Sequence, residues 1–210
     1  MWLYRTSRCS ETPIILYDYR PNRKAENAEK YLEDFKGYLH TDGYKAYRSI
    51  DDVTIVGCWA HARRRFCEAL EILPKEQRKA TAAIGLDYCG KLYAIEKKMK
   101  DESPEDRLKE RQEQAKPLLD AFFAWAKSLR NIAPKSKLGK AVNYLIEEEP
   151  YLRRYIEDGR LEIDNNRAER SIKPFVIGRK NWLFANTPSG AKASATVFSI
   201  IETAKGNGLD

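Results

Sequence analysis

The stretch GYLHTDGYKAYRSIDDVTIVGCWA, residues 37–60, decides the fold class of this chain. It begins with a short β-forming run that ends at an Asp-Gly pair and finishes with an apolar run. The pattern predicts a strand over residues 38–42, a helix over residues 44–50 and a buried strand over residues 53–60. Strands that alternate with helices indicate an α/β core.

The residues before this stretch predict two more strands and a helix. The runs WLYR (2–5) and PIILYDYR (13–20) are rich in β-branched and aromatic residues, and the polar residues between them are typical of a hairpin connection. Asn27 is a candidate N-cap for a helix over residues 28–35, and Gly37 is placed to end that helix.

A helical block follows the apolar run. From His61 to about Tyr155 the chain is rich in Lys, Glu, Ala and Leu, which favour helices. Two segments repeat apolar residues at alternating steps of three and four, as in helices packed along a seam: Tyr88, Leu92, Ile95 and Met99, then Ala115, Leu119, Phe122, Ala126 and Leu129. The run DESPED (101–106) predicts a turn between them. We expect a helical hairpin packed on its own domain, with an oligomerising coiled coil as the alternative.

These textures predict three parts: a first core segment over residues 1–60, a helical insertion over residues 61–160, and the remainder of the core over residues 161–210. The last part contains the compact polar run DNNRAER (164–170).

Composition restricts the class of protein. A chain of 210 residues with 42% hydrophobic side chains can bury a core. No run approaches the ~18 apolar residues of a membrane span, and the start lacks a signal peptide, so a cytoplasmic location is expected. Lys and Arg exceed Asp and Glu by 38 − 31 = 7, which favours polyanionic partners. Four widely spaced cysteines without a CxxC pair argue against disulfides and a zinc ribbon.

Asp42 is the first candidate catalytic residue. It ends a predicted strand, and Gly43 lets the chain turn away and leave the carboxylate exposed. Metal-dependent cleavage of phosphodiesters needs carboxylates on rigid supports, close enough to hold two Mg²⁺ ions about 4 Å apart. An ordinary turn residue is the alternative interpretation.

Glu169 is the second candidate. We expect DNNRAER to form a short helix capped by Asp164 or Asn165, with Asn166, Glu169 and Lys173 close to one face. Amide, carboxylate and ammonium groups together suit a metal ion beside a phosphate. The alternative is a solvated polar helix start.

Three separated motifs, HTDGYKAY (40–47), GCWAHARRRF (57–66) and DNNRAERSIKPFVIGRKNWLFA (164–185), resemble in the same order the transposases of the insertion sequence 66 family. The resemblance implies a ribonuclease-H-like mixed sheet with an inserted helical hairpin, and makes Asp42 and Glu169 the second and third members of an Asp-Asp-Glu triad. It further implies Mg²⁺ or Mn²⁺ in a two-ion site of the complete protein, transposon and target DNA as partners, and self-association in a transposition complex at the bacterial nucleoid.

The resemblance also places the family's first Asp upstream of the segment that matches residues 2–20. We therefore expect the sheet to lack its first, central strand and the triad to be incomplete, with Asp18 a strand-end surface residue. The predicted function is a DDE transposase catalytic domain that is truncated and inactive alone, so whether the chain is an enzyme stays open. The alternatives are a non-catalytic DNA-binding remnant and a protein-interaction module built on the helical block.

Basic and amide side chains near the motifs are candidates for DNA phosphate contacts: Arg63, Arg64, Arg65, Asn166, Arg167, Arg170, Lys173, Arg179 and Lys180. His61 is a candidate for contacting DNA or orienting the site, or an ordinary packed residue. Its C-x₂-H spacing with Cys58 is half of a zinc site, but no second pair is placed to complete it. Trp182 and Phe184 are candidates for base stacking or for packing under the sheet.

Overall fold

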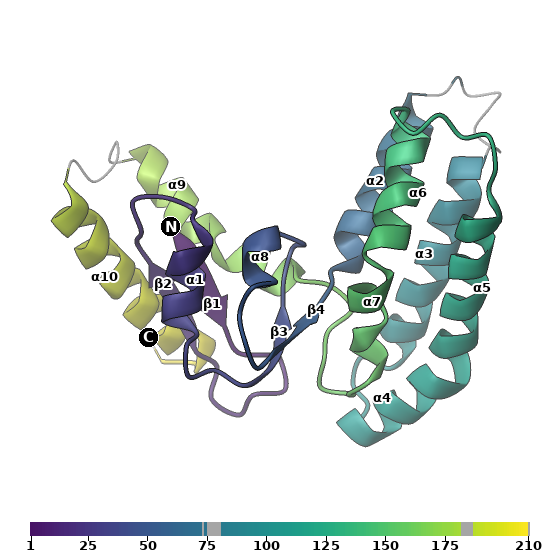
Figure 1. Cartoon of the computed structure of the whole chain (residues 1–210). Coiled ribbons are helices and arrows are strands. Elements are labelled where there is room, and N and C mark those ends of the chain that lie inside the picture. Colours follow the sequence, from purple (N-terminus) through teal and green to yellow (C-terminus); the bar gives the residue numbers. More distant parts are fainter. Residues whose placement is uncertain (73, 75–80, 182–186, 210) are drawn as a thin grey trace. The chain divides into compact units, whose positions relative to one another are not determined.

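The computed structural model describes residues 1–72, 74, 81–181 and 187–209, with only the backbone described for residues 179–181 (Figure 1). Trp182 and Phe184 therefore lie outside the described residues. The chain divides into two compact units. The first contains Met1–Phe35, Ala46–Asp51 and Asn165–Asp210, and the second contains Lys36–Lys45 and Asp52–Asp164.

The first unit is built on a β-hairpin. Its elements are β1 (Trp2–Arg5), β2 (Ile15–Asp18), α1 (Ala25–Tyr31), α8 (Asn166–Ser171), α9 (Lys173–Asn181) and α10 (Pro188–Gly206). The strands are antiparallel, with Arg5 opposite Ile15 and Trp2 opposite Asp18. The two strands predicted near the start of the chain are thus confirmed.

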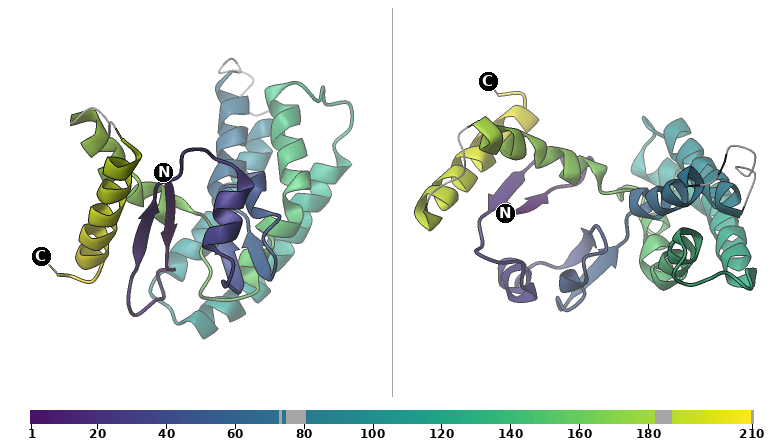
Figure 2. Two further views of the ribbon diagram at one scale, coloured as in Figure 1. Left: turned by 60° about the vertical axis from the view of Figure 1, so that its left-hand side comes forward. Right: turned by 90° about the horizontal axis from the view of Figure 1, so that it is seen from above.

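Helix α10 runs beside the hairpin (Figure 2) and occupies the edge of β2 that faces away from β1. The backbone N–H of Ile15 donates to Thr203 Oγ1 at 2.9 Å, and that of Tyr17 donates to Ser199 Oγ at 2.8 Å. Side-chain hydroxyls therefore satisfy donors that an edge strand leaves unpaired. Ile15, Tyr17 and Ala195 are buried together in a small core.

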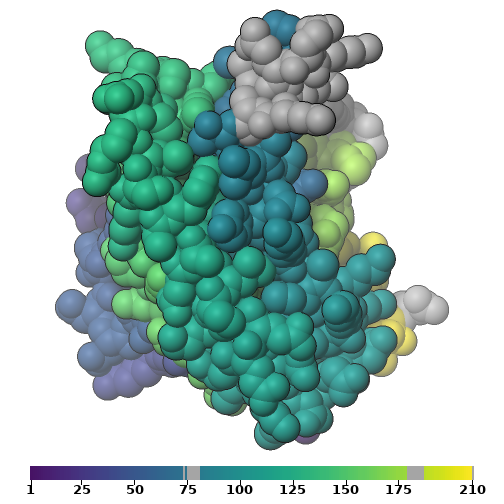
Figure 3. All heavy atoms as spheres, turned by 90° about the vertical axis from the view of Figure 1, so that its right-hand side faces the viewer, coloured from purple at the N-terminus to yellow at the C-terminus, as the bar shows by residue number. Residues whose placement is uncertain are grey.

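The second unit combines a parallel strand pair with most of the helices. Its elements are β3 (Gly37–His40), β4 (Val53–Val56), α2 (Trp59–Glu71), α3 (Thr81–Lys98), α4 (Pro104–Glu110), the π-helical segment η3 (Arg111–Ala115), α5 (Lys116–Ser128), α6 (Lys137–Glu147), α7 (Glu149–Leu152) and the 3₁₀ helix η4 (Arg154–Ile156). Atoms of α3 and α5 cover much of the face seen in Figure 3. The 3₁₀ helix η1 (Lys45–Tyr47) lies where the chain passes from this unit to the first.

The large core of the second unit lies between these helices and β4. Trp59 is fully buried, donates from Nε1 to the Leu152 carbonyl at 2.9 Å, and packs on the rings of Phe122 and Phe123. Residues of both predicted seams enter this core, so these helices pack against one another within the second unit. Val56 of β4 belongs to the same core, so the strand pair and the helical block are packed as one unit.

Arg111 in η3 is a fully buried cation that joins distant segments of this unit. Its Nε and Nη2 donate to the two carboxylate oxygens of Glu96 at 2.8 and 2.7 Å. The guanidinium also donates to the carbonyls of Tyr155, Asp158 and Leu161 at 2.8–2.9 Å. All of these are charge-assisted bonds, so Arg111 fixes the loop that leads toward α8.

Several elements predicted from sequence are shorter or shifted. The helix expected over residues 28–35 with Asn27 as its cap is instead α1, preceded by Lys24. The cause is local: Asn22 Oδ1 accepts from the Lys24 N–H and from Asn27 Nδ2, so the helix starts earlier. The predicted helix 44–50 is only the three-residue η1.

The strand predicted over residues 53–60 ends at Val56, because Gly57 lies against α7 and Trp59 already begins α2. The mixed α/β class is confirmed, but the described residues hold two separate two-stranded sheets. A ribonuclease-H-like sheet is therefore implied by the family alone, and the boundaries at residues 60 and 160 stay predictions. Within the described part of the chain, no helix is both long and apolar enough to cross a membrane.

Candidate metal and nucleic-acid site

Asp42 stands on a defined turn at the carboxyl end of β3. The Thr41 N–H donates to the Val56 carbonyl at 3.0 Å and so continues the parallel pairing up to the turn. Asp42 is exposed, and its Oδ1 accepts from the Tyr44 N–H at 3.0 Å. Its Oδ2 makes no hydrogen bond within the described residues. An exposed carboxylate at a strand end is a suitable oxygen ligand for Mg²⁺.

Gly43 permits this turn because its φ is +84°, a conformation that L side chains rarely adopt. The helical block lies close to it. A Cβ on Gly43 would stand 3.3 Å from the hydroxyl of Tyr144 and 3.9 Å from Oε2 of Glu148. The end of α6 therefore lies close to the Asp42 turn, and both the positive φ and this close approach favour glycine at this position.

The side chains behind the turn form a mixed polar layer. Arg65 of α2 places its guanidinium carbon 4.2 Å from the centre of the Tyr144 ring, a cation–π contact. Burial, with the neighbouring Glu148 carboxylate, raises the pKa of Tyr144 well above its usual value, so its phenol stays protonated. Glu148 itself is buried, with 6% of its surface exposed. Sequence reasoning identified Arg65 but missed Tyr144 and Glu148.

His40 lies on β3 two residues before Asp42. Its Nε2 lies 2.8 Å from the Gly57 carbonyl on the neighbouring segment. Burial lowers the pKa of His40 to about 4, although the hydrogen bond to Gly57 acts in the opposite direction. His40 is therefore neutral at physiological pH and supports the strand pair rather than contributing charge.

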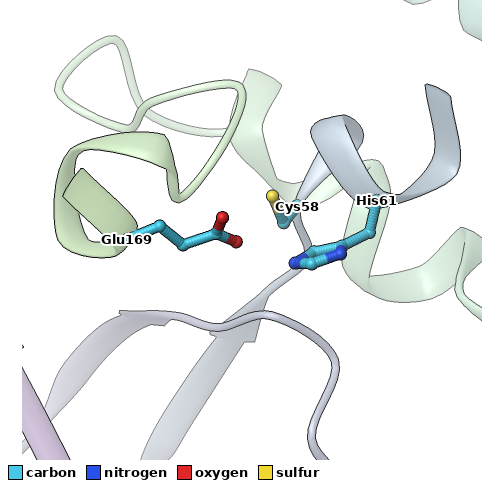
Figure 4. Close-up of side chains that lie close together, drawn as sticks. All are labelled: Cys58, His61 and Glu169. Carbon is cyan, nitrogen blue, oxygen red and sulfur yellow. The ribbon is translucent and has the colours of Figure 1, made fainter. Parts of the chain in front are cut away.

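Cys58 and His61 both belong to the start of α2. Cys58 is the buried N-cap residue, its carbonyl accepts from the His61 N–H at 3.2 Å, and both are labelled on their element in Figure 4. This hydrogen bond belongs to the first turn of the helix, so Cys58 and His61 are neighbours because they are three residues apart in that turn. The four cysteines are free thiols.

Glu169 lies on α8 of the first unit, and its side chain is labelled in Figure 4. The predicted short helix is confirmed: Asn165 is its N-cap, and its carbonyl accepts from the Glu169 N–H at 3.1 Å. Asp164, the other candidate cap, instead accepts from the Tyr93 hydroxyl at 2.7 Å. Because Asp42 and Glu169 belong to different units, their approach stays a prediction.

The candidate DNA-binding residues fall into two groups. Arg63, Arg64 and Arg65 are all exposed on α2 of the second unit. In the first unit, Asn166 and Arg167 are half-buried on α8 and Arg170 and Lys173 are exposed. The side chains of Arg179 and Lys180, on α9, lie outside the described residues. Asp18 is less exposed than predicted, because its carboxylate pairs with Nε of Arg20 at 2.6 Å.

The second unit thus offers an exposed carboxylate at a strand end, and the first unit offers a carboxylate on a short helix, each with arginines in the same unit. Metal-dependent processing of nucleic acids uses side chains of these kinds. A family model described as "Transposase IS66 family" matches residues 1–193. The chain therefore belongs to the IS66 family of transposases, and it is a DDE transposase domain. Proteins of this class bind DNA and generally use divalent metal ions.

Three curated relatives from Sinorhizobium fredii are similar along almost the whole chain. "Uncharacterized protein y4qI" is 32% identical over 225 residues, which cover 100% of this chain and 41% of the relative. "Uncharacterized protein y4jD" and "Uncharacterized protein y4hP" are 31% and 30% identical, and each match covers 94% of this chain. The chain thus spans about two fifths of the length of these relatives. No solved structure matches the chain.

Proposed function

We propose that this chain supplies Asp42 and Glu169 as two carboxylates of a DDE active site, which cleaves and joins transposon DNA with divalent metal ions. The observation that supports this most directly is the exposed Asp42 carboxylate on a turn held by β4 and α6. Rigid placement matters because metal sites need ligands fixed to within about half an ångström.

The donor set suits Mg²⁺ or Mn²⁺. Asp42 offers Oδ2 to solvent while Oδ1 is engaged by the Tyr44 N–H, so the carboxylate is oriented before a ligand arrives. Bound Mg²⁺ supplies Lewis-acid activation of the attacking and leaving oxygens of a phosphodiester. Glu169, on the helix of a different unit, would complete the pair of ligands that this chain provides.

The chain's cations would hold the DNA backbone. Arg63 and Arg64 project from α2 into solvent, whereas Arg65 also stacks on Tyr144. We expect Arg63 and Arg64 to contact phosphates, and Arg65 to contribute mainly to the layer behind Asp42. Binding dominated by phosphates weakens as salt concentration rises.

The first test is Mn²⁺ binding to the chain, measured by electron paramagnetic resonance. We expect Asp42→Asn and Glu169→Gln each to weaken Mn²⁺ binding at least about tenfold. Exposed carboxylates elsewhere provide matched controls, Asp101→Asn and Glu113→Gln. If the two site variants bind Mn²⁺ like the controls, these carboxylates do not hold metal.

The second test asks whether the two carboxylates share one site. Fe²⁺ in place of Mg²⁺, with peroxide and ascorbate, cuts the polypeptide close to the bound ion. We expect cuts beside both Asp42 and Glu169, and loss of both sets in either single variant. Cuts beside only one of them would contradict a shared site. If the chain bound DNA but not metal, it would be a DNA-binding domain that does not catalyse cleavage or strand transfer.

A further inference from the structure

A cationic cleft lies within the first unit, between the end of β1, α8 and the end of α10. The cleft is open to solvent, and its volume is about 420 Å³. Its lining includes four cations, Arg5, Arg167, Arg170 and Lys205, and one carboxylate, Glu202. The lining charge is therefore 4 − 1 = +3, which favours an anion.

Arg5 gives this cleft a fixed wall. Its Nη1 donates to Ser171 Oγ at 2.6 Å and to the Arg167 carbonyl at 3.3 Å. The Tyr17 hydroxyl donates to the Ser171 carbonyl on the same turn of α8. The strands of the hairpin thus hold α8, which carries Arg167 and Arg170, beside Arg5.

Two other cations of the cleft, Lys205 and Arg170, differ in whether they form an ion pair. Lys205 pairs with the Glu202 carboxylate at 3.2 Å, which offsets the one anionic group in the lining. Arg170 is exposed and makes no ion pair among the described residues. A planar guanidinium with open N–H groups suits a phosphate, which it can bind through two parallel hydrogen bonds.

The cleft lies on the face of α8 that does not carry Glu169. Arg167, Arg170 and Ser171 follow one another at helical spacing and all line the cleft. Glu169 is about 200° around the helix from Arg167 and is absent from the lining. A group bound in the cleft therefore lies away from the Glu169 carboxylate.

We propose that this cleft binds a backbone phosphate of the DNA, at a nucleotide other than the one being cut. The inference rests on the proposed function and extends it to Arg5 and Lys205, which the sequence motifs do not single out. Because the cleft is open to solvent, a phosphate of a DNA strand that lies across it can reach these cations. Phosphate contacts of this kind fix the register of a protein on DNA.

The test measures binding of a fluorescent DNA duplex to the chain across a range of salt concentrations. Arg170→Gln combined with Lys205→Gln removes two cleft charges, and Arg130→Gln with Lys192→Gln removes two exposed charges elsewhere. We expect the cleft variant to bind about tenfold more weakly than the control variant. Its log–log salt slope should fall by about 0.9 for each DNA phosphate that the variant no longer neutralises.

A footprint provides a second readout: bound DNA should protect Lys205, but not Lys192, from acetylation. Equal binding by the two double variants would overturn the proposal. The proposal would also be overturned if the cleft variant lost binding of free phosphate, measured by ³¹P nuclear magnetic resonance, but kept its affinity for DNA. The ligand of the cleft would then be a free anion. Either result leaves Mn²⁺ binding at Asp42 unaffected, whereas failure of the wild-type chain to bind DNA would refute the proposed function itself.

Discussion

Replacing Gly43 by alanine tests whether the helical block holds the Asp42 turn. A φ of +84° costs a residue with a Cβ roughly 1–2 kcal/mol, while the less flexible unfolded chain returns about 0.4–1 kcal/mol. The new Cβ would also stand 3.3 Å from the Tyr144 hydroxyl, so the turn or α6 must shift by a few tenths of an ångström. The net destabilisation is about 1 kcal/mol.

This loss is small for a chain of this size, equivalent to a fall of about 2–4 °C in melting temperature. The effect on metal binding should be larger, because Asp42 moves with the turn. We expect Mn²⁺ affinity to fall about tenfold, as when a group that orients a metal ligand is lost. Circular dichroism measures the melting temperature, and electron paramagnetic resonance measures Mn²⁺ affinity in the same sample.

Tyr144→Phe separates contact from backbone strain. It removes the hydroxyl that the new Cβ meets, so Gly43→Ala with Tyr144→Phe should recover part of the lost Mn²⁺ affinity, a coupling that a double-mutant cycle measures. Asparagine tolerates positive φ, so Gly43→Asn should retain the affinity loss with less destabilisation. The reasoning is refuted if Gly43→Ala binds Mn²⁺ within twofold of wild type, or if the double variant recovers nothing.

Three further substitutions test the second unit. Arg111→Leu leaves the Glu96 carboxylate and three carbonyls without their donor, so it should destabilise the unit by about 3–5 kcal/mol in urea unfolding; an effect below 1 kcal/mol would contradict this. Trp59→Phe deprives the buried Leu152 carbonyl of its donor and should cost about 2–3 kcal/mol, read from the same urea curves. Burial would raise the pKa of Glu149, but its ion pairs with Lys127 and Arg153, at 2.6 and 2.8 Å, lower that pKa overall. The stability that this carboxylate contributes is present above its unfolded pKa of about 4.3 and is lost as pH falls below that value. Glu149→Gln should therefore make the free energy of unfolding depend less on pH in this acid range.

The sequence predicted the parts of this site that depend on local pattern. Asp42 stands at a strand end and Glu169 on a short helix, as the Asp-Gly turn and the polar helix start indicated. The seam residues Leu92 and Phe122 are fully buried because their spacing places them on one helix face. These features follow from neighbours within a few residues, and such neighbours can be read directly from a sequence.

The layer behind Asp42 could not be predicted, because it is made by long-range packing. Tyr144 lies 144 − 43 = 101 residues beyond the glycine that it contacts. In sequence it appears only as one more aromatic residue on an amphipathic helix. For Arg65, the sequence predicted a phosphate contact but not the stacking on the Tyr144 ring. That stacking depends on how α2 and α6 pack against each other.

The packing of β4 explains why the helical block matters for a carboxylate that lies outside it. Val56 and Trp59 share one core with Phe122 and Leu145, so β4 cannot move without repacking these helices. Thr41, next to Asp42, is tied to Val56 by a backbone hydrogen bond. Displacement of the helices is thus transmitted through β4 to the turn, since close-packed cores shift as units and transmit strain. The helical block therefore acts as a support for the proposed metal ligand, in addition to any contact that its exposed arginines make with DNA.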